Sequence, residues 1–207
     1  IVFACRNIKS VIIPKEIKYI KSHAFGDCEE LKLIEISNDS EMISFGKSLF
    51  NKSSIKNLFI PSNFKDFEDG WCKDTPELFK VKISPENKNF KYLDDKHQII
   101  VGKSDKNSDI FDTIIFACRD IQSVAIPKEI KYIKRSAFED CHNLTSIEFS
   151  EDSELLFIGK EAFSYSELKE IKIPKSVYQI QRGAFDFSTK LKKVVFEKGS
   201  KLESFEP

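Results

Sequence analysis

The chain repeats itself, and this feature constrains its fold more than any other. When the sequence is shifted by 113 residues, residues 1–50 align with residues 114–163 without a gap, and 31 of the 50 positions are identical. The segment from Pro14 to Lys21 recurs unchanged at 127–134. A fixed internal period is typical of repeat architectures, in which stacked copies bury a common core.

A shorter period lies within each long unit, marked by an apolar anchor that opens a pattern of the form L-x-x-I-x-I-P. The anchors are Ile8, Leu31, Ile55, Leu78, Ile121, Leu144, Leu168 and Leu191. Their spacings are 23, 24, 23, 43, 23, 24 and 23, so one step contains 43 − 23 = 20 extra residues. This predicts one domain over 1–207, with coils 1–4 at 1–83, coils 5–8 at 114–207 and an insertion at 84–113.

The pattern itself predicts short strands. The segment with apolar residues at positions 1, 4 and 6 is too short for a helix, and the closing Pro cannot donate to a strand ladder. Strands of successive coils would then stack in parallel, about 4.8 Å apart. The recurrent aromatic residues Phe25, Phe138, Phe163 and Phe185 are expected to be buried between coils. The 113-residue identity disfavours the rival interpretation, an antiparallel β-sandwich.

The motifs resemble the BspA-like leucine-rich repeat. The segment Leu168–Val177 matches the opening of that repeat, and Ile158–Phe163 matches its close. The resemblance implies a right-handed leucine-rich-repeat solenoid of the α/β horseshoe class, with eight coils, mostly short parallel strands and few helices. Coil 3 has Gly70-Trp71-Cys72 in place of Ala-Phe, and residues 31–37 lack the Pro, so local irregularity is expected in both places.

The insertion contains two β-prone runs around the polar segment from Asp94 to His97, which predicts a hairpin. One interpretation is that this hairpin covers exposed coil edges. The other is a partner-binding loop, because long inserts on rigid scaffolds often carry function.

Composition and motifs argue against several classes of function. The 33 basic and 33 acidic residues cancel, which disfavours nucleic-acid binding and a polybasic membrane surface. No apolar run is long enough to insert into a membrane. The three His share no motif, and no zinc, dinucleotide or P-loop pattern occurs. The sequence therefore predicts a protein that is not an enzyme, with no cofactor and no metal.

Four of the five Cys recur three residues before an anchor: Cys5, Cys28, Cys118 and Cys141. Stacking would bring each pair within reach of a disulfide, but stacked Cβ vectors are parallel, which favours buried thiols. Sequons begin at Asn38, Asn51 and Asn143. Asn38 and Asn51 fall in predicted turns and are candidate glycosylation sites, whereas Asn143 adjoins a core anchor.

Positions 2, 3 and 5 of each strand should point away from the core and form one face, which the solenoid model makes concave. Over eight coils these 24 positions hold nine Lys and three acids, a net charge of 9 − 3 = +6. The candidate ligand-binding residues combine this charge with apolar side chains: Lys9, Lys32, Leu33, Lys56, Phe59, Phe79, Lys80 and Lys82. One interpretation is that these residues bind an acidic protein segment or an anionic glycan; the other is that the Lys only keep the strand face soluble.

The resemblance implies a protein-binding or adhesion module of the cell surface, or a secreted one, that recognises host cells, matrix or anionic glycoproteins. An intracellular protein-interaction scaffold is the alternative, because the same solenoid would serve it. The chain starts inside a coil and stops before its last coil closes, so a piece of a longer protein is expected. Open coil ends of such a piece would favour end-to-end self-association.

Overall fold

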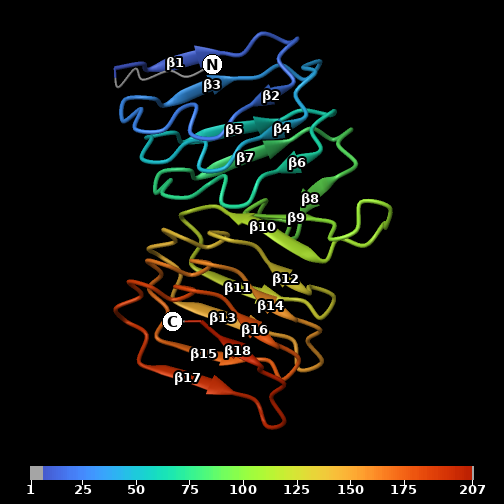
Figure 1. The fold of residues 1–207 in the computed structure, drawn as a ribbon, viewed down its shortest axis with the longest axis vertical. Helices are drawn as coiled ribbons and strands as arrows, with labels where there is room; N and C mark the ends of the chain where they lie inside the picture. The colour runs from blue at the N-terminus through green and yellow to red at the C-terminus, as the bar shows by residue number, and fades with distance from the viewer. Residues whose placement is uncertain (1–6, 207) are drawn as a thin grey trace. The chain divides into compact units, whose positions relative to one another are not determined.

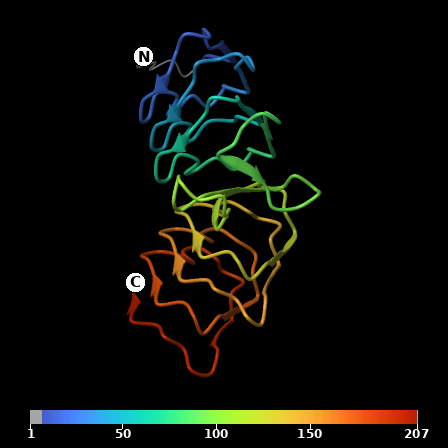
Figure 2. The ribbon, with the colours of Figure 1, turned by 90° about the vertical axis from the view of Figure 1, so that its right-hand side faces the viewer.

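The computed structural model describes residues 7–206, and within them it contains strands and turns but no helix. The chain divides into two compact units, residues 1–98 and 99–207. Each unit is a stack of coils, visible as successive loops of the ribbon in Figures 1 and 2. The predicted β-solenoid of short parallel strands is confirmed.

In unit 1, one strand follows each anchor, and the four strands form a parallel sheet in the order β1-β3-β5-β7. These strands are β1 (Ser10–Ile12), β3 (Leu33–Glu35), β5 (Asn57–Ile60) and β7 (Lys80–Ile83). The opposite side of each coil holds a two-residue strand. These strands also pair in parallel: β2 (Tyr19–Ile20), β4 (Ser44–Phe45) and β6 (Asp66–Phe67).

Unit 2 repeats this arrangement. The strands after its anchors are β11 (Ser123–Ile126), β13 (Ser146–Phe149), β15 (Glu170–Ile173) and β17 (Lys193–Phe196). The two-residue strands are β12 (Tyr132–Ile133), β14 (Phe157–Ile158), β16 (Gln179–Ile180) and β18 (Ser204–Phe205), which are joined in parallel. The second row of strands was not predicted, because two residues are too short to show a period.

A third ladder runs along the Ala-Phe segments. Phe25 N–H donates to the carbonyl of Leu49 at 3.0 Å, and Phe138 N–H donates to the carbonyl of Ala162 at 2.8 Å. The residues two positions before and two positions after each Phe have positive φ, for example His23 (58°) and Asp27 (56°) around Phe25. These left-handed residues turn the chain tightly while keeping one hydrogen bond between coils at every second residue.

The core follows the predicted columns. Phe25, Phe138 and Phe163 are buried, and the Phe138 and Phe163 rings stack 5.1 Å apart. Phe185 was also predicted to be buried, but it is half-buried. It stacks on Phe163 at 5.6 Å and is the last ring of this column among the described residues, so only one of its faces is covered by an aromatic ring.

The two coils with irregular motifs keep the fold. Trp71 takes the place of the usual small residue, is buried, and stacks on Phe67 with ring centroids 4.4 Å apart. The strand that lacks a closing Pro, β3, pairs normally with β1 from Ser10↔Leu33 to Ile12↔Glu35. Side-chain packing therefore accommodates Trp71, and main-chain pairing with β1 continues without the Pro.

The 84–113 segment contributes to both units. In unit 1 it forms β8 (Phe90–Tyr92). The Tyr92 hydroxyl accepts a hydrogen bond from Ile83 N–H at 3.0 Å and donates to the carbonyl of Val81 at 2.9 Å. It therefore satisfies two main-chain groups on β7, the last strand of its sheet.

In unit 2 the segment forms β9 (Ile99–Gly102), which pairs antiparallel with β10 (Thr113–Ala117). The β10 strand then pairs in parallel with β12, which joins the antiparallel pair to the coils. This pairing was not among the sequence predictions. Arg119, just after β10, is buried, lies over the Phe116 ring at 4.7 Å, and donates to the carbonyls of Ala137 and Ser136.

Candidate functional site

The eight candidate ligand-binding residues all lie on the β1-β3-β5-β7 sheet of unit 1 or immediately before its strands. The main chain aligns them in rows: Lys32 N–H donates to the carbonyl of Lys9 at 3.0 Å, and Phe79 N–H donates to that of Lys56 at 3.1 Å. The strand register places Phe59 opposite Lys82. The coil frame therefore groups these side chains on one surface, which we call the unit 1 strand face. It consists of the twelve residues at positions 2, 3 and 5 of the four strands: Lys9, Ser10, Ile12, Lys32, Leu33, Glu35, Lys56, Asn57, Phe59, Phe79, Lys80 and Lys82.

Most of the candidate residues are exposed. All five Lys are accessible, and the apolar side chains of Leu33 and Phe79 are 42% and 41% exposed. Phe59 is half-buried, so it contributes less surface than predicted. The only acid among the twelve positions is Glu35, which leaves the face with a charge of 5 − 1 = +4.

One of the lysines on the unit 1 strand face forms an ion pair within the unit. The Lys56 ammonium lies 3.2 Å from the carboxylate of Glu77, the residue just before the next anchor. Both side chains are at least 40% exposed, so this pair is weak. Lys32 forms no ion pair within 4 Å among residues 7–206, and its charge remains available to a ligand.

The corresponding face of unit 2 has a different electrostatic pattern. The Lys172 ammonium lies 2.8 Å from the Glu197 carboxylate, and Lys193 lies 3.7 Å from Glu170. The hydrogen bond between Lys172 and Glu197 raises the pKa of Lys172 and lowers the pKa of Glu197. Two of the lysines on this face therefore have an acidic partner nearby, whereas in unit 1 the position matching Glu170 is Asn57 and carries no charge.

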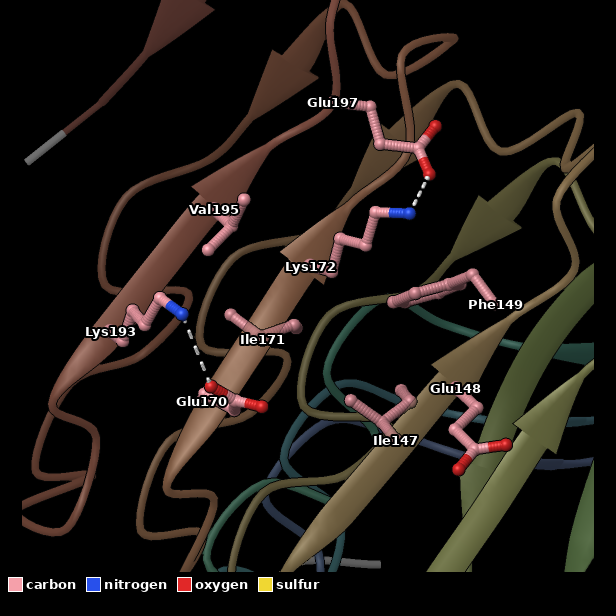
Figure 3. A pocket seen from close by; sticks show the side chains of 9 residues that line it. All are labelled: Ile147, Glu148, Phe149, Glu170, Ile171, Lys172, Lys193, Val195 and Glu197. Carbon is pink, nitrogen blue, oxygen red and sulfur yellow. Dashed lines mark ion pairs between the residues drawn. The ribbon is translucent and has the colours of Figure 1, made fainter.

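A hollow of about 500 Å³ opens on this second face. Figure 3 shows its lining side chains along three neighbouring strands, β13, β15 and β17, and just beyond the end of β17. The residues are Ile147, Glu148, Phe149, Glu170, Ile171, Lys172, Lys193, Val195 and Glu197. The strand pattern alone does not predict this hollow, although it places several of the lining residues on the strand face.

The hollow coincides with an interruption of the sheet. The pairs β11-β13 and β15-β17 form separate two-stranded sheets, with no ladder between β13 and β15. A signal for this lies in the turn before β15: five positions separate Phe163 from Leu168, whereas six separate Phe138 from Leu144. In unit 1 the turn from Phe50 to Ile55 is equally short, and the β3-β5 pairing there is reduced to Leu33↔Asn57.

The sequons differ in accessibility. Asn38 is exposed in a turn. The side chain of Asn51 is half-buried, and its amide nitrogen donates to the Asp74 carboxylate at 3.2 Å. Asn38 is therefore the more accessible candidate for glycosylation, whereas Asn51 would have to give up a hydrogen bond. Asn143 is exposed, although it adjoins a buried anchor.

The cysteines lie in the core. Cys28, Cys72, Cys118 and Cys141 are buried thiols, whereas Cys5 lies outside the described residues. The Cys141 thiol donates to the carbonyl of Cys118 at 3.8 Å, as expected for stacked coils. Burial raises the pKa of Cys141 to about 12, so this thiol stays protonated and unreactive at neutral pH.

The described residues hold no group of three or more His, Cys, Asp or Glu side chains placed to bind a metal ion. Among residues 7–206, no helix is present that could cross a membrane. The ring of His97 stacks on Tyr92 at 4.2 Å, and that of His142 meets the edge of Tyr165. His97 and His142 therefore lie against different aromatic rings.

Similarity to solved structures supports the fold. The chain is similar to the pneumococcal vaccine antigen PcpA, with 24% identity and a TM-score of 0.84, covering 96% of this chain and 47% of that one. It is also similar to a leucine-rich cell surface protein of Faecalibacterium prausnitzii, with 16% identity and a TM-score of 0.65, covering 94% and 61%. The chain thus spans about half to three-fifths of these proteins. No curated protein matches the sequence.

The sequence also matches a family model. The model for the BspA type leucine rich repeat region matches residues 2–95 and 108–206, in six copies. The match covers both stacks of coils. The strand after each anchor and the column of stacked Phe rings agree with it. The chain belongs to the BspA-type leucine-rich repeat family.

Proposed function

We propose that this chain is a binding module of the cell surface that attaches to an acidic segment of a protein or glycoprotein through the unit 1 strand face. The observation that carries the proposal is the +4 face, on which Lys32, Lys80 and Lys82 surround exposed Leu33 and Phe79. Membership of a repeat family whose similar structures include a cell surface protein supports the proposed location.

The face can bind by two complementary contributions. Lysine side chains attract a carboxylate- or sulfate-bearing ligand over about 8–10 Å at physiological salt. Leu33 and Phe79 then provide apolar surface that loses water when a partner covers it. Such a site acts by binding alone, without a chemical step.

The proposal is tested by reversing charge on the face. Lys32→Glu with Lys80→Glu changes two exposed positions that form no ion pair among residues 7–206. Binding of poly-L-glutamate and of heparin is measured by calorimetry, and we expect the double variant to bind at least about tenfold more weakly, a change of about 1.4 kcal/mol. The two probes distinguish an acidic peptide from an anionic glycan.

The matched control carries the same change of charge elsewhere in unit 1. Lys47→Glu with Lys65→Glu alters two exposed lysines beside β4 and β6, outside the strand face. If the control loses as much affinity as the face variant, binding is a general effect of charge and the proposed site is wrong.

The cellular location is tested separately. Labelling intact cells with a membrane-impermeant reagent should modify the protein if it lies on the surface. Detection only after lysis would favour the alternative function, an intracellular protein-interaction scaffold built on the same solenoid.

We also propose that the chain self-associates through apolar side chains near its last strands. Val194, Phe196 and Phe205 are 38%, 41% and 55% exposed on β17 and β18. Light scattering at increasing protein concentration should show a rise in mass, and Phe196→Lys with Phe205→Lys should reduce it. A constant monomer mass for the unmodified chain would contradict this part of the proposal.

A further inference from the structure

On the strand face of unit 2 the sheet is interrupted, whereas the matching sheet of unit 1 is continuous. Between β13 and β15 the ladder is absent, whereas β3 and β5 remain in one sheet through the pair Leu33↔Asn57. The facing edges of β13 and β15 therefore have main-chain groups that no ladder uses. Ile147 and Ile171 lie on these edges and line the hollow, but they are only 8% and 2% exposed, so its accessible apolar surface comes mainly from Phe149 and Val195, which are half-buried.

The carboxylates around this hollow differ in how firmly they are held. Glu197 accepts hydrogen bonds from Lys172 at 2.8 Å and from the Lys175 main-chain N–H at 3.1 Å, so its charge is well compensated. Glu170 meets Lys193 at 3.7 Å, and both side chains are at least 65% exposed. An exposed pair at that distance contributes little and exchanges readily.

Glu148 has no ion pair within 4 Å among the described residues, and it is exposed on β13. In Figure 3 Glu148 and Glu170 extend from the two strands that border the interruption, with Ile147 drawn between them. The hollow thus combines apolar surface with two carboxylates that a ligand can use.

We infer that this hollow accepts the side chain of an arginine or lysine presented by a protein partner. The aliphatic stem of such a residue would pack against Phe149 and Val195, the half-buried apolar side chains of the lining, as long basic side chains commonly pack on apolar surface. Its cationic group would bind Glu148 and Glu170 through charge-assisted hydrogen bonds, which are about twice as strong as neutral ones. An acidic or purely apolar side chain would leave Glu148 unmatched and Glu170 with its exposed pair to Lys193 alone.

The inference goes beyond the proposed function and does not rest on it. It concerns other residues, another unit and a ligand of opposite charge. The internal duplication supports the distinction: a shift of 113 residues places Asn57 at the position of Glu170 and Lys82 at that of Val195. Unit 1 therefore lacks one of the two carboxylates and still has two lysines, Lys80 and Lys82, at the matching positions, so its equivalent surface should not take the same ligand.

The test is a titration with acetyl-arginine amide, followed by nuclear magnetic resonance of the isotopically labelled full chain. We expect saturable shifts of the main-chain amides at 147–149 and 170–172, with none at the equivalent residues 34–36 and 57–59. Acetyl-citrulline amide has nearly the same shape without the charge, and it should bind about tenfold more weakly.

The decisive variant is Glu148→Gln with Glu170→Asn. Asn57 occupies the matching position of unit 1, so the coil tolerates Asn there, and both changes are on exposed positions. We expect at least about a tenfold loss of acetyl-arginine amide affinity. Glu35→Gln, which changes the unit 1 equivalent of Glu148, is the matched control and should leave this affinity unchanged.

Val195→Lys gives a second test that does not remove a carboxylate. It introduces the residue that unit 1 carries, and its ammonium should repel the probe. The inference is overturned if the amide shifts do not saturate, if citrulline binds equally well, or if the double variant retains its affinity. Poly-L-glutamate binding should be unchanged or stronger in the variant with Glu148→Gln and Glu170→Asn. Failure of the proposed arginine or lysine site in unit 2 is therefore distinguishable from failure of the proposed site on unit 1.

Discussion

The Phe138 side chain illustrates how single residues stabilise this solenoid. It is completely buried, and its ring stacks on that of Phe163 in the next coil at an interplanar angle of 14°. One coil cannot bury such a ring alone, so the energetic value of each Phe depends on its neighbours along the column. The sequence identified the column, because the Ala-Phe pair recurs at nearly constant distance from the anchors.

Replacing Phe138 with Ala should lower the free energy of unfolding by about 3–5 kcal/mol, because the substitution removes a large buried side chain and leaves a cavity. Urea denaturation measures this loss. Phe185→Ala is the matched control: Phe185 is half-buried, so its loss should be clearly smaller. Equal losses would show that ring burial does not determine the contribution of this column.

Cys141 makes stability depend on pH in the alkaline range. Its pKa is raised by burial from 9.0 to about 12 in the folded chain, so the unfolded state loses this proton first as pH rises. The contribution is fully present below about pH 9 and decreases by about 1.4 kcal/mol per pH unit until about pH 12. Urea denaturation from pH 8 to pH 10.5 should show a shallower decline for Cys141→Ala than for the original chain. Parallel declines would contradict the pKa shift.

At the scale of elements, the strand edges and turns decide how coils fit together. Gly159 follows β14, where a Cβ would lie 2.7 Å from the main-chain nitrogen of Arg135 in the preceding coil. Gly46, its equivalent in unit 1, has a comparable approach of 2.2 Å to Ser22 N. Both positions require glycine because neighbouring coils approach too closely for a side chain.

The edge of β7 should depend on one hydroxyl group. Tyr92→Phe removes the hydrogen bonds to Ile83 N–H and the Val81 carbonyl while it keeps the ring. We expect a loss of about 1–3 kcal/mol in unfolding free energy, because two main-chain groups lose a partner in a part-buried site. Tyr19→Phe is the control, since Tyr19 is 52% exposed on β2. Hydrogen exchange at Ile83 N–H should also accelerate in Tyr92→Phe alone, and unchanged protection there would rule out this role.

At the scale of the whole molecule, zero net charge conceals an uneven distribution. The strand-face positions carry a total of +6, of which unit 1 contributes +4, and the remaining residues carry −6. The duplicated coils keep the core pattern while the exposed strand positions differ, so two surfaces built on one scaffold have different electrostatics. Fold alone therefore does not determine what each surface binds.

This distribution predicts a strong salt dependence of binding at unit 1. The association constant for poly-L-glutamate should fall steadily as the salt concentration rises, because the Debye length shortens from about 10 Å at 0.1 M to about 3 Å at 1 M. Calorimetric titrations over that range measure the effect. Affinity that does not vary with salt would indicate that the exposed Leu33 and Phe79, rather than the lysines, dominate binding.

The sequence by itself determined the period, the strand after each anchor and the buried columns, because these features depend on apolar spacing within one coil. It also identified the lysine-rich face, since alternation along a strand assigns side chains to opposite sides. Only the tertiary structure revealed the row of two-residue strands, the β9-β10 pair and the opening between β13 and β15. It alone also revealed the ion pairs Lys56–Glu77 and Lys172–Glu197. These features depend on how one coil is placed against the next, and differences of one residue in a turn alter that placement without changing the repeat pattern.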